Sequence, residues 1–350
     1  MLRHSRVLVV AGAALLVVAL VAALDRDVFG GDPSSDSSDG QTDPCNGDPA
    51  LCSRPYNEVA FPATHNAMST ADEGDWFRPQ QPTDVIGQLD AGVRVFLIDS
   101  WYGQTTDQSG VVTNIAASRR EALGQARQTF GTAAVERALR ASHAGRLDAV
   151  GPVEPYLCHN LCELGATLWE PLMEEVAKWM RDHPREVVTF FIQDTVTAED
   201  TATLFSNAGL TPYVYTPTWG QPWPTLGQMI ESGKRLVVLM ENHDGGPDYP
   251  WLLRGFKWVQ DTPYDTNRVP EFSCTRLRGK PNSPLFLVNH WLSNPRSRAA
   301  VADKANSARV LGEHLRRCES ERGMIPNFVA VDFYDHGSLF AQVDRLNGLS

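Results

Sequence analysis

Short, largely apolar runs recur at seven places along the chain after residue 52. They are rich in Val, Ile, Leu and Phe, and they occupy residues 59–62, 93–98, 153–157, 187–192, 236–240, 285–288 and 328–331. Short apolar runs that do not alternate with polar residues are typical of strands buried on both faces, as in a parallel sheet. The pattern therefore predicts seven strands of a parallel sheet.

Helical patterns lie between several of these strands. Residues 168–180 carry an apolar stripe at helix spacing, which Pro184 ends, and residues 299–315 show the same periodicity. A third helical segment, residues 119–143, is rich in Ala and Arg and is predicted to be a surface insertion. Strands that alternate with helices favour an α/β fold. We expect a TIM-type (β/α) barrel, distorted or incompletely closed.

The N-terminus carries a long apolar segment. Arg3 and Arg6 precede residues 7–24, which contain no charge and are just long enough to cross a bilayer. We expect a single membrane-spanning helix; a cleaved signal peptide is the alternative. Residues 25–44 are polar and rich in Gly and Ser, as in a flexible linker. The predicted organisation is an anchor or signal segment over 1–24, a linker over 25–44 and a barrel domain over 45–350.

These segments predict where the chain resides. An uncleaved helix gives a single-pass protein of the cell membrane with the barrel outside, and cleavage gives a secreted protein. The net charge of −11 argues against a nucleic-acid partner, because nucleic-acid affinity depends on Lys and Arg that contact phosphates. We expect the exported barrel to be a monomer.

Six cysteines follow the apolar segment, at positions 45, 52, 158, 162, 274 and 318. An even number in an exported chain favours disulfides, but sequence alone leaves fifteen pairings open. Closeness in the chain favours Cys45–Cys52 and Cys158–Cys162, which leaves Cys274–Cys318. Zinc is the alternative for the run Cys158-His159-x-x-Cys162. It is disfavoured because no second ligand pair with suitable spacing exists.

Polar residues follow each predicted strand. They are His65-Asn66, Asp99, His159-Asn160, Gln193-Asp194, Glu241-Asn242-His243, Asn289-His290 and Asp332. Barrel enzymes build their active sites at the C-terminal ends of their strands. We therefore interpret these residues as the ring of an active site.

Two histidines in such a ring can act as general base and general acid near neutral pH. Cleavage of a phosphodiester by an internal hydroxyl needs such a pair, and a cation to stabilise the charge on the phosphoryl oxygens. Asn66 and Asp99 offer the oxygen ligands that Ca²⁺ or Mg²⁺ prefers. Asp332, on the last strand beside the first, is placed to hold His65 in one tautomer.

The runs Thr64-His65-Asn66-Ala67-Met68, Leu157-Cys158-His159 and Asn327 to Tyr334, with the segments 88–99 and 187–194 between them, occur in the same order as conserved blocks of a known family. Together they resemble the X domain of phosphatidylinositol-specific phospholipase C, over residues 55 to about 340. The resemblance implies that His65 is the general base, His159 the general acid and Asp332 the carboxylate that pairs with His65. It also implies Ca²⁺ ligands at Asn66 and Asp99, and a further ligand near Gln193 or Asp194, for which we select Asp194.

Two positions depart from the family's pattern. Trp101 stands where metal-independent members have an arginine, and Leu97 stands where calcium-dependent members have a glutamate. We predict that Arg94, Glu241, His290 and Tyr334 contact the substrate. For Arg94 a structural role is an equal alternative, Asp194 is equally a ligand or a loop cap, and Glu241 is also a candidate to pair with a buried cation.

The predicted function is that of a phosphoric diester hydrolase similar to phosphatidylinositol phospholipase C. Its expected substrate is a phospholipid or inositol phosphodiester, with Ca²⁺ as the expected cofactor. A surface module that binds lipid or inositol phosphate head groups without turnover is the alternative. A glycerophosphodiesterase or sphingomyelinase-like barrel is disfavoured. Those enzymes depend on a cluster of Glu and Asp metal ligands near the first histidine, whereas here Asn66 stands beside His65.

Overall fold

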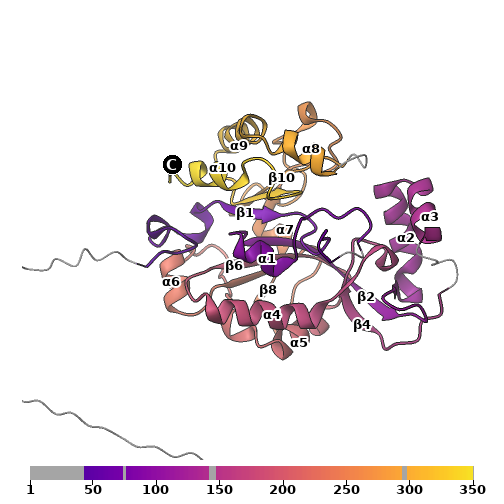
Figure 1. Ribbon diagram of the computed structural model, residues 1–350. Helices are drawn as coiled ribbons and strands as arrows, with labels where there is room; N and C mark the ends of the chain where they lie inside the picture. Colours follow the sequence, from indigo (N-terminus) through magenta and orange to yellow (C-terminus); the bar gives the residue numbers. More distant parts are fainter. Residues whose placement is uncertain (1–42, 74–75, 142–146, 294–297, 350) are drawn as a thin grey trace, which may run out of the picture. The chain divides into compact units, whose positions relative to one another are not determined.

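A parallel sheet of eight strands forms the centre of the protein (Figure 1). The computed structural model describes residues 43–73, 76–141, 147–293 and 298–349. The strand order is β8-β7-β6-β2-β1-β11-β10-β9. The bounds are β1 Phe61–Thr64, β2 Val95–Thr105, β6 Val188–Asp194, β7 Leu236–Met240, β8 Leu252–Arg254, β9 Val259–Asp261, β10 Leu285–His290 and β11 Phe328–Val331.

The sheet curls around an apolar interior to which all eight strands contribute. Ala63, Val95, Leu253, Val259 and Leu285 belong to one buried cluster, although β8 and β9 lie at opposite ends of the strand order. A flat sheet would hold these two strands far apart. Helix α7 (Gly255–Trp258) connects them, and no β8–β9 pairing occurs among the described residues. The prediction of an incompletely closed (β/α) barrel is confirmed.

Alternate residues of each strand face outward and pack against the helices. Phe190 and Ile192 of β6, for example, share a buried cluster with Val176 of α4 and Phe205 of α5. Figure 1 shows α4 and α5 below the sheet and α9 and α10 above it. The helices are α1 Val85–Asp90, α4 Trp169–Asp182, α5 Ala198–Asn207, α6 Leu226–Glu231, α8 Arg298–Ala305, α9 Ala308–Arg322 and α10 Leu339–Leu346; 3₁₀ turns span Pro49–Leu51, Tyr56–Glu58, Cys162–Leu164, Thr211–Tyr213 and Val269–Glu271.

One predicted barrel strand is not part of the barrel. The run at 153–157 forms β4 (Glu154–Leu157), which pairs antiparallel with the extended end of β2. Short strands β3 (Val112–Asn114) and β5 (Thr167–Leu168) continue this antiparallel extension. Strands β8 and β9, of three residues each, complete the barrel in place of the run at 153–157.

Two predicted helices are each divided in two. The insertion forms α2 (Ala116–Phe130) and α3 (Thr132–Ala141), separated by Gly131 at a φ of +84°. A residue with a side chain rarely adopts a positive φ, so glycine permits the break. The segment predicted at 299–315 is likewise divided between α8 and α9.

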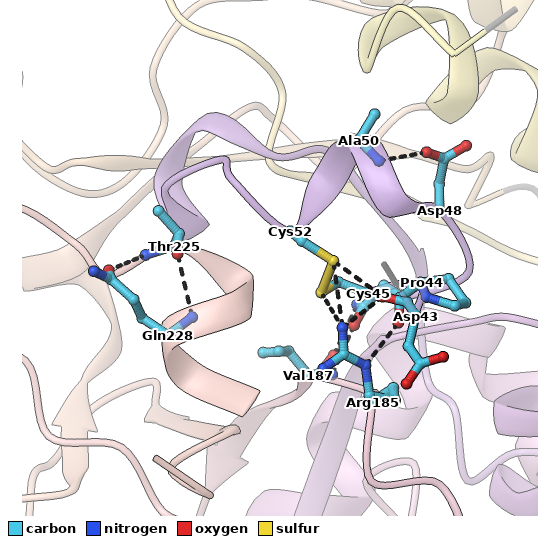
Figure 2. Close-up of a disulfide and its surroundings, with 11 residues drawn as sticks. Asp43, Pro44, Cys45, Asp48, Ala50, Cys52, Arg185, Val187, Thr225 and Gln228 are labelled. Atoms are coloured by element: carbon cyan, nitrogen blue, oxygen red, sulfur yellow. Dashed lines mark hydrogen bonds between the residues drawn. A yellow bond between two sulfur atoms is a disulfide. The ribbon is translucent and has the colours of Figure 1, made fainter. Parts of the chain in front are cut away.

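The three disulfides join the residues that are closest in the sequence. They are Cys45–Cys52, Cys158–Cys162 and Cys274–Cys318, which excludes a zinc site at Cys158 and Cys162. Figure 2 shows the first of them beside Arg185, whose guanidinium donates to the carbonyl oxygens of Asp43 and Pro44. The hydrogen bonds of Arg185 tie the start of the described chain to the segment before β6.

The predicted anchor at 7–24 and nearly all of the linker at 25–44 lie outside the described residues. Within residues 43–349, apart from their three short gaps, no helix combines the length and apolar character that a membrane span requires.

Candidate active site

Pairing of the first and last strands brings His65 and Asp332 together. Strands β1 and β11 run parallel with Thr64 opposite Val331, so the residues that follow the two strands are neighbours. Nδ1 of His65 lies 2.8 Å from Oδ1 of Asp332. When Nδ1–H is donated to this carboxylate, Nε2 of the neutral ring is left as the proton acceptor.

Trp291 covers the face of the His65 ring. The two ring centroids are 3.7 Å apart and the ring planes differ by 6°. Trp291 directly follows β10, the neighbour of β11. With Asp332 at its edge and Trp291 on its face, the His65 ring is held in one orientation. The indole face also attracts a protonated imidazole.

His159 approaches the same place from the loop that follows β4. Its ring centroid is 6.4 Å from that of His65, and the two ring planes differ by 79°. The amide nitrogen of Asn66 lies 3.3 and 3.4 Å from the two ring nitrogens of His159. Asn66 adopts a φ of +46°, in the left-handed region that asparagine tolerates better than most residues. Two histidines and one carboxylate thus meet at the C-terminal edge of the sheet.

A pocket of about 130 Å³ opens beside His65 at this edge. Its apolar lining includes Leu97, Phe191 and Leu287, which pack in the interior of the barrel. Its polar lining consists of His65, Asp99, Gln193, Glu241, Tyr264, Arg278 and Asn289, with Trp291 on one wall. An apolar lining with several convergent polar groups is typical of a small-molecule site.

Among the acids that line this pocket, Asp99 has the pKa that is shifted most. Burial raises its pKa well above the usual range, and the nearby carboxylate of Glu241 raises it further. A buried carboxyl beside another acid is stabilised either by a proton or by a cation. Among the described residues, only Cys274, His314 and Cys318 bring three His, Cys, Asp or Glu ligand atoms within 4.8 Å of one another. Two of those three residues form a disulfide, so that cluster does not bind a metal as it stands.

Arg278 supplies a positive charge to this pocket and was not among the predicted residues. Its Nη1 donates to Glu241, and its Nη2 and Nε lie 2.6 and 2.9 Å from Oδ2 of Asp261. Burial lowers the pKa of Arg278, but Asp261 and Glu241 outweigh burial and leave it raised. The guanidinium also lies over the rings of Phe256 and Tyr264. Glu241 therefore pairs with a cation, as the alternative for this residue predicted, although Arg278 is half-buried rather than buried.

The structure does not bring Asp194 to the pocket lining. One carboxylate oxygen accepts from the backbone N–H of Asn242 at 2.8 Å, and the other contacts the backbone nitrogen and Nδ1 of His243 at 3.1 and 2.6 Å. Both carboxylate oxygens of Asp194 thus bind the loop that follows β7. This is the role of a loop cap, which was the alternative to a metal ligand for this residue. Gln193, one residue earlier, lines the pocket instead.

Arg94 and Tyr334 also lie away from the pocket lining. Arg94 precedes β2, at the opposite end of the barrel, where its guanidinium contacts Glu186 at 2.7 Å and the carbonyls of Leu89 and Val93. Tyr334 is buried, and its hydroxyl pairs with Thr83 at 3.0 Å. Both side chains are engaged in contacts that hold the barrel together.

His290 faces the helices rather than the pocket. Its Nε2 lies 2.9 Å from the carbonyl oxygen of Ala305, and its Nδ1 lies 2.8 Å from Nδ1 of His314 on α9. Phe272 stacks on both rings. His290 is fully buried and His314 is 3% exposed, so this pair belongs to the core.

The buried pair of His290 and His314 predicts a loss of stability in mild acid. Burial lowers the pKa of His290 to about 4; burial, with His290 and Arg317 nearby, lowers that of His314 to about 3. Because histidine in an unfolded chain titrates near pH 6.5, the unfolded state takes up protons first as the pH falls below 6.5. We expect the free energy of unfolding to fall towards pH 4 by up to about 1.4 kcal/mol per pH unit for each histidine.

Urea denaturation at several pH values checks this expectation. The His290→Gln variant is expected to show a shallower decline between pH 6.5 and 4.5 than the unaltered protein. Equal slopes for the two proteins would show that the histidine pair does not control the acid sensitivity.

Comparison with known proteins identifies the family. The PI-PLC X family model, PI-PLC X 1, matches residues 146–347, more than half of the chain. The chain belongs to the PI-PLC X domain family. The matched PI-PLC X region contains His159 and Asp332, whereas His65, Asn66 and Asp99 precede it.

Relatives extend the similarity towards the N-terminus. A PI-PLC X domain-containing protein of the fungus Arthroderma benhamiae is 27% identical over 325 residues, which cover 87% of this chain and 90% of that protein. A PI-PLC X domain-containing protein of Arabidopsis thaliana is 32% identical over 212 residues, 55% of this chain and 49% of that one. A second Arthroderma benhamiae relative, an uncharacterized secreted protein, is 25% identical over 88% of this chain and 65% of its own length.

Among solved structures, the chain resembles a phosphatidylinositol-specific phospholipase C of Staphylococcus aureus. The TM-score is 0.49 at 12% identity, over 84% of this chain and 94% of that one.

Proposed function

We propose that this protein is a phosphoric diester hydrolase that cleaves phosphatidylinositol or a related inositol phosphodiester. The observation that carries the proposal is the meeting of His65, Asp332 and His159 at one edge of the sheet, with the two histidine rings 6.4 Å apart and His65 on the lining of a pocket. Membership of the PI-PLC X domain family supports phosphodiester chemistry.

In the proposed reaction, a hydroxyl of the head group attacks the phosphorus atom of its own diester. His65 takes the hydroxyl proton through Nε2, while Asp332 stabilises the resulting imidazolium. His159 gives a proton to the leaving oxygen, so the products are a cyclic phosphodiester and an alcohol, which is diacylglycerol for a phospholipid. Later hydrolysis of the cyclic ester reverses the two proton transfers.

We propose that Asn66 and Asp99 hold a Ca²⁺ ion when one is bound, without Asp194. The donor set fits in part: Asp99 is a buried carboxyl beside a second acid, and Asn66 offers an amide oxygen. Bound calcium would stabilise the charge that develops on the phosphoryl oxygens. Leu97 offers no ligand atom, and Glu241 is engaged with Arg278.

We further propose that the barrel acts as a monomer outside the cell, either on the single-pass membrane helix predicted at 7–24 or as a secreted protein. Three disulfides support an oxidising compartment. The Arthroderma benhamiae relative that is named a secreted protein supports export.

An assay of the purified chain on phosphatidylinositol vesicles, with Ca²⁺ and with a chelator, tests the proposal. We expect release of diacylglycerol and a cyclic inositol phosphate, and a decrease in rate when the chelator is present. Full activity in chelator would contradict the calcium proposal alone. Vesicle binding without cleavage of any phosphodiester would contradict the proposed function and favour a binding module.

A further inference from the structure

The helical insertion packs against the loop that carries His159. We define the insertion as residues 112–141 (β3, α2 and α3) and the acid loop as residues 158–164. Side chains of both segments form one buried cluster, separate from the interior of the barrel and from its helix layer. The insertion contributes Val112, Ala122, Ala126, Phe130 and Val135, and the acid loop contributes Cys158, Leu161, Cys162 and Leu164. Figure 1 shows α2 and α3 to one side, apart from the helices that cover the sheet.

Polar contacts fix the acid loop to the insertion on the C-terminal side of His159. The side chain of Asn114 donates to the carbonyl of Asn160 at 3.1 Å and accepts from the N–H of Cys162 at 3.0 Å. Glu163 has a fully buried side chain, which accepts from Arg119 at 2.7 Å and from Thr113 at 2.8 Å. The Cys158–Cys162 disulfide closes the acid loop across His159. Side chains of the insertion therefore fix the acid loop through hydrogen bonds to its backbone and to Glu163.

Phe130 extends this support to the imidazole itself. Its ring lies at the end of α2, is 4% exposed, and meets the His159 ring edge to face, with centroids 5.1 Å apart and planes at 73°. Asn66, from the end of β1, approaches the same imidazole. His159 therefore lies between a group of the barrel and a group of the insertion. Edge-to-face aromatic pairs have a preferred geometry, so the contact with Phe130 restricts how the ring can rotate.

We propose that Phe130 is a positioning residue for His159, and that holding the general acid is the role of the insertion. This inference rests on the proposed function, because it requires His159 to protonate the leaving group. A displaced acid slows cleavage of a diester whose leaving group is an alkoxide. It has little effect when the leaving group is an aryl oxide, which departs without a proton.

The test compares two substrates with the Phe130→Leu variant: phosphatidylinositol, with an alkoxide leaving group, and an aryl phosphodiester of inositol. On phosphatidylinositol, we expect kcat to fall by about tenfold to a hundredfold with KM changed less than about twofold. On the aryl ester, we expect kcat to stay within about twofold. His159→Asn is expected to show the same substrate dependence more strongly, and Phe130→Tyr, which keeps the ring, to restore most of the phosphatidylinositol rate.

Val135→Ala is the matched control, because Val135 is fully buried in the same cluster and lies on α3. It is expected to lower the stability of the insertion without changing the ratio of the two rates. Equal rate losses of Phe130→Leu on both substrates, or no loss on either, would overturn the proposal.

Nuclear magnetic resonance of the histidine rings separates this inference from the proposed function. In Phe130→Leu we expect the nuclear Overhauser effects between the His159 ring and the Asn66 side chain to weaken, while those between the rings of His65 and Trp291 keep their strength. If the unaltered chain cleaves neither substrate, the proposed function fails, and a weakened contact of His159 with Asn66 would still support its positioning by Phe130. An unchanged contact between His159 and Asn66 would overturn the positioning role whatever the activity.

Discussion

Replacing His65 by asparagine is expected to lower kcat on phosphatidylinositol by about 10²- to 10⁴-fold, the usual contribution of a general base. Asparagine keeps a polar side chain of similar reach but accepts no proton. The fold should persist, because the His65 ring contacts Asp332 and Trp291 at the edge of the pocket and is 19% exposed. Initial rates together with a thermal melt distinguish loss of the base from unfolding.

The same substitution at His183 is the matched control. This histidine is exposed at the end of α4 and stacks on Trp179, away from the pocket. His183→Asn is expected to retain full activity. Asp332→Asn should give an intermediate rate, because the imidazole remains but loses the carboxylate that orients it. A His65→Asn variant within tenfold of the unaltered rate would contradict the role of His65 as base.

The sequence was sufficient to predict the barrel and the meeting of His65, His159 and Asp332. The strands that precede His65 and Asp332 are short apolar runs bounded by polar residues, and the first and last strands of a barrel must be neighbours. His65 and Asp332, which follow these two strands, are therefore close to each other whatever the details of side-chain packing. His159 was predicted both from the apolar run at 153–157 and from its motif; because β4 is not a barrel strand, only the motif gives a valid reason.

The two-residue repeat of a strand explains why two of the predicted substrate and metal residues, His290 and Asp194, lie away from the pocket lining. Leu285 and Leu287 face the barrel interior, so Asn289 faces the pocket, whereas His290 faces the helices. By the same alternation Gln193 faces the pocket, and Asp194 does not. Alternate residues of a strand face the same side. Continuing the series of inward-facing residues to the end of each strand would have selected Asn289 and Gln193 as pocket residues.

Arg278 could not be found in this way. It lies in the long connection between β9 and β10, and β9 has only three residues, too few for an apolar pattern. Its place depends on Glu241 and Asp261, which come from separate strands. A contact among three distant segments exists only after the barrel has closed, and no local signal marks it.

Arg278→Met is expected to lower the free energy of unfolding at pH 7 by about 3 kcal/mol, because removing one partner of a buried ionic group leaves the others uncompensated. The side chains of Asp261 and Glu241 are 0% and 13% exposed. Burial already raises the pKa of Glu241, and Arg278 opposes that rise. Without the guanidinium, this pKa rises further, so acid relieves the penalty. The loss should therefore be smaller at pH 5 than at pH 7, as urea denaturation at both values can measure.

The exposed pair of Arg309 and Glu313 on α9 provides the control for charge removal. These side chains are 74% and 58% exposed, so Arg309→Met should cost no more than about 0.5 kcal/mol. Adding Asp261→Asn and Glu241→Gln to Arg278→Met removes the stranded charges, and most of the lost stability should return. If the triple variant is no more stable than Arg278→Met, the loss comes from packing against Phe256 and Tyr264 rather than from charge. Since Arg278 and Glu241 line the pocket beside His65, recovery would also show that charge balance, rather than side-chain packing, stabilises this side of the pocket.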